Sequence, residues 1–153
     1  MSSRLPDTPA RRHPENLGVL LREPFRFGTE VLHRRFAERG HAEVRPPHDN
    51  VFQFLDDDGT RVGVLAERAQ ITKQSMGYLV DYLEQRGYLE RRPDPSDRRA
   101  ALISLTDRGW EQVRAALRII ATIEEEWASG LGRPRMQQLR LLLGDLRQLT
   151  GNG

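Results

Sequence analysis

A change of hydrophobic period within residues 72–105 constrains the fold most. Residues 72–86 (TKQSMGYLVDYLEQR) are predicted to form an amphipathic helix with Thr72 as its N-cap. Its apolar side chains follow the spacing of one buried helical face, at Met76, Leu79, Val80 and Leu83. Residues 88–92 and 100–105 then have the composition of strands, joined by the turn-forming segment PDPSDRR. A capped helix is therefore followed directly by a hairpin with a basic tip.

Further helices are predicted upstream of the capped helix. Residues 61–69 (RVGVLAERA) predict a short helix directly before it, and another is expected after Pro46 and Pro47, which should forbid helix across them. Residues 15–39 have helical spacing that is interrupted at Pro24, where we expect a kink or the start of a new helix. Two short helices, a tight link, a capped helix and a hairpin predict a winged helix-turn-helix.

Two long helices are predicted downstream of the hairpin, one from the N-cap Thr106 and one from about Pro134. The first carries an apolar stripe at Trp110, Val113, Leu117, Ile120, Ile123 and Trp127. The second carries another at Met136, Leu139, Leu142, Leu143, Leu146 and Leu149. These stripes are more apolar than the core of a small winged helix needs. They predict either a helical hairpin within the chain or, as we prefer, a two-fold interface between two copies.

The outer face of the 72–86 helix carries the side chains that we expect to contact DNA. An α-helix fits the major groove and presents its N-terminal residues to base edges. Gln74 can pair bidentately with adenine, and Lys73 can reach guanine or a phosphate. The predicted set is Thr72, Lys73, Gln74, Ser75, Gly77 and Tyr78. Taken alone, this pattern is equally typical of an ordinary solvated helix face.

The hairpin favours DNA binding over a solvated face. Residues 91–99 (RRPDPSDRR) place four arginines and two prolines around its tip. Exposed arginines at such a tip can enter a narrow A·T-rich minor groove, whereas the alternative is a solubilising charged turn. We expect Asp97 to hold the loop in shape by bonding to Arg99 or to backbone amides. The predicted wing set is Arg91, Arg92, Asp97, Arg98 and Arg99.

Residues 48–110 also resemble a known family. The matching segments are LAERAQITKQSM, LVDYLEQRGYLERRPDPSDRRA and LTDRG, and they resemble the MarR family of multiple-antibiotic-resistance-type regulators. The wing motif of that family, D-x-R, is present as Asp97-Arg98-Arg99. The chain departs from the usual pattern at Gly77 and Tyr78, where threonine and arginine are often found.

The resemblance implies an obligate homodimer with intertwined terminal helices, which binds double-stranded DNA at an inverted repeat and acts as a repressor. It also implies release by a small aromatic or phenolic effector that binds between the dimerisation and DNA-binding parts. The candidate lining is Phe25, Phe36, His48, Phe52, Trp110 and Arg114, residues that are equally compatible with a role in the core.

The predicted fold is therefore mainly α with a small antiparallel β-wing. We expect residues 1–14 to form a disordered tail, and residues 15–47 an N-terminal dimerisation helix and connector. Residues 48–105 would form the winged helix-turn-helix DNA-binding domain, and residues 106–153 the C-terminal dimerisation helices.

Composition excludes several other classes of protein. The chain has no cysteine, which excludes disulfides, thiolate zinc sites and cysteine nucleophiles. Four histidines have no metal-ligand spacing, so we expect no metal and no cofactor. There is no apolar run of membrane-spanning length and no signal peptide, which predicts a cytoplasmic protein without a membrane partner.

Two other functions compete with DNA binding. An enzyme is disfavoured, because the sequence has no GxSxG elbow and no phosphate-binding glycine loop. The serious alternative is a winged-helix module that binds protein, which should tolerate loss of Lys73, Gln74, Arg98 and Arg99.

Overall fold

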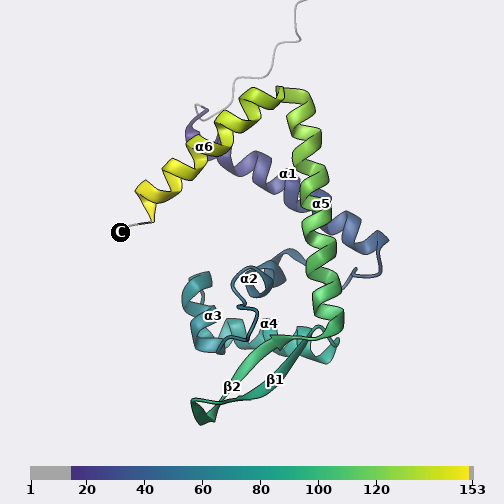
Figure 1. The fold of residues 1–153 in the computed structure, drawn as a ribbon, viewed down its shortest axis with the longest axis vertical. Coiled ribbons are helices and arrows are strands. Elements are labelled where there is room, and N and C mark those ends of the chain that lie inside the picture. Colours follow the sequence, from purple (N-terminus) through teal and green to yellow (C-terminus); the bar gives the residue numbers. More distant parts are fainter. Residues whose placement is uncertain (1–14, 152–153) are drawn as a thin grey trace, which may run out of the picture.

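The computed structural model describes residues 15–151, so the predicted tail at residues 1–14 lies outside the described residues. The chain is mainly helical with one two-stranded sheet, as predicted (Figure 1). In chain order the elements are α1 (Leu17–Glu38), the 3-10 helix η1 (Pro46–His48), α2 (Asp49–Phe52), α3 (Val62–Ala69), α4 (Lys73–Gln85), β1 (Leu89–Asp94), β2 (Asp97–Leu105), α5 (Asp107–Leu131) and α6 (Arg133–Thr150).

The elements form two lobes (Figure 1). The winged-helix lobe comprises η1, α2, α3, α4 and the β1–β2 hairpin, and the helical lobe comprises α1, α5 and α6. Helix α5 runs from the base of the hairpin in the first lobe to α6 at the opposite end of the molecule. No helix within residues 15–151 combines the length and the apolarity needed to cross a membrane.

The winged-helix lobe encloses a continuous apolar core. Most of the inward positions predicted for α4 are confirmed, since Met76, Val80 and Leu83 are fully buried. They pack in one cluster with side chains from α3 and β2, including Leu65 and Ile103. This packing leaves the opposite face of α4 in solvent.

Backbone geometry fixes the turn between α3 and α4. Gln70 has a left-handed φ of 55° and ends α3, where the amide of Ile71 donates to the carbonyl of Ala66. The Thr72 side chain then accepts a hydrogen bond from the amide of Ser75, as an N-cap does. The predicted capped helix is confirmed.

The hairpin is longer than predicted. β1 and β2 pair antiparallel from Leu89 opposite Leu105 to Asp94 opposite Asp97, so the turn is only Pro95 and Ser96. The pairing reaches the tip because the Asp94 carboxylate accepts from the Ser96 amide and hydroxyl, which closes the turn locally. A bridge between Thr60 and Ile103 was not predicted.

Of the two alternatives predicted for Pro24, a new helix is wrong and a kink stays a prediction, and the helix expected after Pro46 and Pro47 begins at Pro46. Pro24 lies inside α1, which is one helix by its hydrogen bonds, so no second helix starts there. Pro46 and Pro47 occupy the first turn of η1, which leads into α2. Proline is tolerated there because the first helical turn has no intrahelical partner for its amides.

The helical lobe leaves large apolar side chains in solvent. The stripe predicted for α5 is only partly covered within one chain, because Leu117 is 63% exposed and Ile120 is 38% exposed. The residues that α5 buries are Gly109, Gln112, Ala115, Ile119, Ile123 and Ala128, of which only Ile123 belongs to the predicted stripe. Helix α6 has no buried residue within the chain, and its Leu149 is 80% exposed.

Candidate nucleic-acid interface

The N-terminal turn of α4 presents short polar donors and a cation to solvent. Thr72 donates from its hydroxyl to Ser75 Oγ over 2.8 Å, while its oxygen accepts from the Ser75 amide over 3.1 Å. Lys73 and Gln74 are both exposed beside this cap. The other amides of the first helical turn have no intrahelical acceptor, which favours a phosphate at this end of the helix.

One turn further along α4, Tyr78 is 66% exposed. Gln74 Nε2 donates to the Tyr78 hydroxyl over 3.3 Å, so the two side chains lie together on the outer face. Gly77 lies between them in sequence, and a Cβ built there would have no neighbour within 4 Å. The position is therefore open but contributes no side chain.

The tip of the hairpin, here called the wing tip (residues 94–99), is held by two aspartates. Arg61 Nε donates to Asp94 over 2.6 Å, and hydrogen bonds from Ser96, followed by the contact with Arg61, lower the pKa of Asp94 to about 2. Asp97 accepts from the Arg99 amide over 3.0 Å, which confirms its predicted role in holding the loop. Arg98 and Arg99 are exposed beside it.

Arg91 and Arg92 lie in the middle of β1 and have partners within the chain. The Arg91 guanidinium contacts Asp81 over 2.5 Å and Glu84 over 3.0 Å, which ties β1 to α4. Burial acts against protonation of Arg91, but these carboxylates raise its pKa overall. Arg92 Nε donates to Ser104 over 3.1 Å. The predicted wing set is thus divided between an exposed tip and two ion-paired arginines in the middle of β1.

Comparison with known proteins identifies the family to which this chain belongs. A family model described as "MarR family" matches residues 50–100. The HTH-type transcriptional regulator YkoM of Bacillus subtilis is 33% identical over 129 residues, which is 84% of this chain and 82% of that protein. The chain belongs to the MarR family. Like its relatives, it is a transcriptional regulator and not an enzyme.

Other relatives of this MarR-family chain match over different lengths. The regulator YdcH of Bacillus subtilis is 39% identical over 61 residues, covering 40% of this chain and 42% of that protein. A structure of the repressor CouR bound to a 23-mer DNA duplex has a TM-score of 0.70 and 27% identity, covering 86% and 92% of the two chains. CouR from Rhodococcus jostii RHA1 bound to p-coumaroyl-CoA has a TM-score of 0.67 and 23% identity, covering 86% and 92%.

The six residues predicted to line an effector pocket of this MarR-family chain lie in different surroundings. Phe25 is 75% exposed, whereas Phe36 is 1% exposed and packs edge-on against His33. His48 is buried and stacks on Tyr82 at 4.5 Å between ring centroids. The remaining three residues are Phe52, which packs against Tyr88, the half-buried Trp110 and the exposed Arg114.

A hollow of about 420 Å³ does occur in the helical lobe. It lies between the first half of α1 and α5, and Val19, Leu20, Phe27 and Trp127 supply its apolar lining. None of the six predicted pocket residues lines it. The described residues also contain no cluster of three or more histidine or acidic side chains suited to a metal ion.

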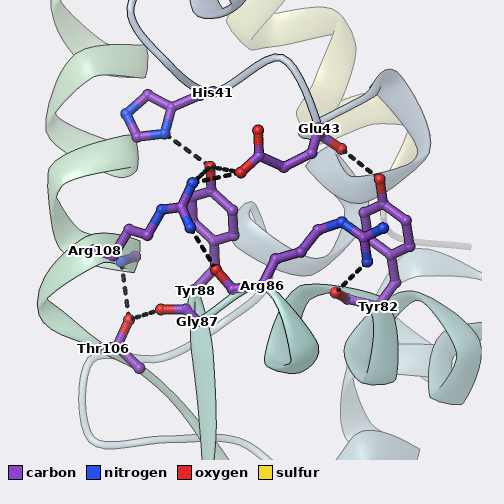
Figure 2. Close-up of polar contacts among 9 residues, drawn as sticks. His41, Glu43, Tyr82, Arg86, Gly87, Tyr88, Thr106 and Arg108 are labelled. Atoms are coloured by element: carbon purple, nitrogen blue, oxygen red, sulfur yellow. Dashed lines mark hydrogen bonds and ion pairs between the residues drawn. The ribbon is translucent and has the colours of Figure 1, made fainter.

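Where the two lobes of the MarR-family chain meet, a polar cluster was missed by sequence analysis (Figure 2). Arg108 of α5 pairs with Glu43 of the connector, and its Nη2 donates to the Tyr88 hydroxyl over 3.1 Å. Tyr88 is fully buried, and His41 Nδ1 lies 2.9 Å from its hydroxyl. No sequence pattern indicated this cluster, because Glu43 and Arg108 are 65 positions apart.

The cluster shifts the ionisation of its members. Burial, and then the hydrogen bond with Glu43, raise the pKa of Tyr88 to about 12. Burial acts against ionisation of Glu43, but hydrogen bonds from its own amide and Tyr88, together with Arg108, lower the pKa of this carboxyl. Burial and the charge of Arg108 lower the pKa of His41. An ionised Glu43 therefore faces a neutral phenol and a guanidinium.

Proposed function

We propose that this regulator is a homodimer that binds an inverted-repeat operator and represses transcription. One observation carries the proposal: the start of α4 and the wing tip expose donors and cations at the same end of the molecule (Figure 1). The side of α4 that packs inward is apolar, so only its polar face is available to a duplex. Since DNA is the proposed partner, we expect the protein to act in the cytoplasm.

In this proposal α4 enters the major groove. Gln74 pairs with a base edge and Lys73 contacts guanine or a phosphate, because both are exposed beside the helix start. Thr72 and Ser75 supply short donors to the phosphate backbone. Gly77 lets the helix approach closely, and the hydroxyl of Tyr78 reaches a phosphate or a base.

The wing tip enters the flanking minor groove. We assign that contact to Arg98 and Arg99, whose side chains are exposed, while Asp97 holds the loop that carries them. Arg91 and Arg92 are predicted to contribute less, because their guanidinium groups already have partners in the chain.

The dimer is supported by the apolar surface of the helical lobe. Exposed side chains gather on all three of its helices, including Leu20 and Phe25 on α1, Leu117 on α5, and Leu142 and Leu149 on α6. We propose that residues 15–47 and 106–153 form the interface, and that residues 48–105 bind DNA. A symmetric pair would hold two α4 helices about 34 Å apart, matching half-sites about 10 bp apart.

We further propose a small aromatic or phenolic acid as effector. The complex of CouR with p-coumaroyl-CoA supports this class of ligand. The residues predicted to line its site, Phe25, Phe36, His48, Phe52, Trp110 and Arg114, remain our candidates, although the hollow between α1 and α5 is lined by other residues. Such a ligand releases DNA if it binds more tightly to a dimer whose recognition helices are wrongly spaced.

Selection of duplexes from a random pool, repeated with phenolic acids present, tests this function. We expect an enriched inverted repeat whose affinity falls by a factor of about 10³ or more between 50 and 200 mM salt, because several phosphates are neutralised. An enriched repeat that is lost when a phenolic acid is added would support the effector. The competing function, a protein-binding winged helix, predicts no enrichment and no salt-dependent duplex affinity.

A further inference from the structure

We propose that Glu43, Tyr88 and Arg108 form an interlobe joint that fixes the angle between the winged-helix lobe and α5. Through that angle the joint sets the spacing of the two half-sites that a dimer accepts. The statement about half-site spacing rests on the proposed function, whereas the statement about the angle concerns one chain alone.

Three separate segments of the chain meet at the joint (Figure 2). Glu43 lies in the connector after α1, Tyr88 lies between α4 and β1, and Arg108 lies in the first turn of α5. Each residue contacts the other two, since the Tyr88 hydroxyl donates to Glu43 over 3.0 Å and the Arg108 guanidinium contacts both.

The hydrogen bonds at the joint leave little rotational freedom. The Tyr88 hydroxyl has one proton and two lone pairs, and all three have partners: it donates to Glu43 and accepts from Arg108 and His41. The second arm of Arg108 donates to the carbonyl of Arg86 over 2.7 Å. Its guanidinium carbon also lies 4.4 Å from the centre of the Tyr88 ring. Turning α5 against the hairpin would break several of these contacts together.

The joint lies on both covalent connections between the lobes. The first is the connector, where Glu43 also accepts at its carbonyl from the Tyr82 hydroxyl of α4 over 3.1 Å. The second is the passage from β2 into α5, where Thr106 donates from its amide to the Tyr88 carbonyl over 3.1 Å and from its hydroxyl to the Gly87 carbonyl. A change of angle at either connection must therefore pass through the joint.

The length of α5 makes its angle important. The helix has 25 residues, which at 1.5 Å per residue is about 37 Å. A rotation of about 5° at one end would move the other by about 3 Å, close to the roughly 3.4 Å between successive base pairs. A loose joint would therefore blur the half-site spacing by about one base pair.

Distances between two spin labels on the same chain test the angle without DNA. The chain has no cysteine, so Gln85→Cys at the end of α4 and Ser129→Cys near the end of α5 would be the two labelled sites. Dilution with unlabelled protein removes distances between subunits. We expect one narrow distance distribution that becomes at least twofold broader with Arg108→Ala and moderately broader with Tyr88→Phe.

The matched control for this experiment is Arg118→Ala, which removes the same charge from an exposed position on the same helix and should leave the distribution narrow. If Arg108→Ala does not fold, as judged by circular dichroism, Glu43→Gln replaces it, because it removes the charge and keeps the shape. A distribution as narrow in the joint variants as in the parent would overturn the proposal.

A second arm of the test measures affinity for operators whose half-site spacing is changed by one or two base pairs. We expect the parent to prefer one spacing by about tenfold or more, and Arg108→Ala to lower this preference to about threefold or less. Equal losses at every spacing would refute the effect on spacing. If no form of the protein binds DNA specifically, the proposed function fails, while the label distances still decide whether the joint fixes the angle.

Discussion

The two lobes differ in how completely a single chain can bury them. In the winged-helix lobe, Leu65, Met76 and Ile103 are fully enclosed by neighbours from the same chain. In the helical lobe, α6 buries no residue, and the large side chains Leu117 and Leu149 are 63% and 80% exposed. Residues of the same chain therefore complete the core of the winged-helix lobe, whereas the helical lobe presents the kind of apolar surface that a partner covers.

This difference separates two sources of stability. The stability from packing within the winged-helix lobe is independent of protein concentration. Any stability that α6 gains from a second copy rises with protein concentration. The contact between the lobes is a third region, because the N-terminal end of α5 lies against the winged-helix lobe and its C-terminal end belongs to the helical lobe (Figure 1). Substitutions can perturb each of these three regions separately.

The largest effect is expected where the lobes meet, at Gly109. A Cβ at this position would lie 2.2 Å from the Tyr88 carbonyl oxygen and 2.9 Å from Leu105 Cδ2, so Gly109→Ala must displace backbone. We expect the free energy of unfolding to fall by about 3 kcal/mol, the upper end of what overpacking usually costs, measured by chemical denaturation. Gly63→Ala in α3 is the control, since its Cβ would meet nothing within 4 Å. Equal stability of both variants would contradict the close approach.

The next effect is expected in the helical lobe, where Leu142→Glu places a charge on the exposed apolar face of α6. We predict dissociation of the dimer in sedimentation experiments. The circular dichroism spectrum of the whole protein should remain that of a folded, helical chain, because the winged-helix lobe has its own core. DNA affinity should fall about 100-fold or more, because linking two binding modules contributes on the order of 10² to 10⁴.

Gln148→Glu introduces the same charge at an exposed polar position of α6 and serves as the control for Leu142→Glu. We expect it to remain dimeric. A Leu142→Glu protein that sediments as the parent does would show that a partner covers a different face.

A smaller effect is expected at the wing tip. Arg99→Ala removes an exposed guanidinium, and its amide contact to Asp97 should survive because that contact uses the backbone. We predict a loss of operator affinity of about fivefold or more, or ~1 kcal/mol, with the dimer unchanged. Arg118→Ala removes an equal charge far from the hairpin and should bind normally in the same shift assay. Equal affinities would argue against a contact from the wing.

Signals that act over a few residues were sufficient to predict much of the winged-helix lobe. The caps at Thr72 and Thr106, and the inward positions Met76 and Val80, are all specified within one or two helical turns. The hairpin end was misplaced because a single side chain, that of Asp94, closes the turn. An Asp-x-Ser sequence is a known turn signal, so this feature could have been found.

Features that depend on distant segments could not be predicted in the same way. Apolar residues occur on more than one face of α5, and the pattern did not indicate that Ile119 faces the chain while Leu117 faces solvent. Glu43 and Arg108 form their pair across 65 positions, with no periodicity that relates them. The six predicted pocket residues stay a prediction, because their surroundings depend on how the lobes pack.

The smallest effect is expected from His33, which joins α1 to the winged-helix lobe. Its Nδ1 donates to the Val44 carbonyl over 2.9 Å and its Nε2 to Asp49 over 2.9 Å. Only the protonated ring can donate at both nitrogens. Burial acts against protonation, but the hydrogen bond and charge of Asp49 raise the pKa of His33 overall from 6.5.

The sign of the pH dependence follows from this raised pKa. The stabilisation from protonated His33 is fully present below pH 6.5, the pKa of the unfolded chain, and is lost as the pH rises through the folded pKa. Chemical denaturation of the parent and of His33→Gln should therefore give a larger stability difference at pH 5.5 than at pH 8.5. His41→Gln is the contrasting variant, because burial and Arg108 lower the pKa of His41, so protonation there opposes folding. A stability difference for His33→Gln that is constant across this range would mean that the ring contributes only as a neutral donor, and that the contact between α1 and the winged-helix lobe does not depend on its charge.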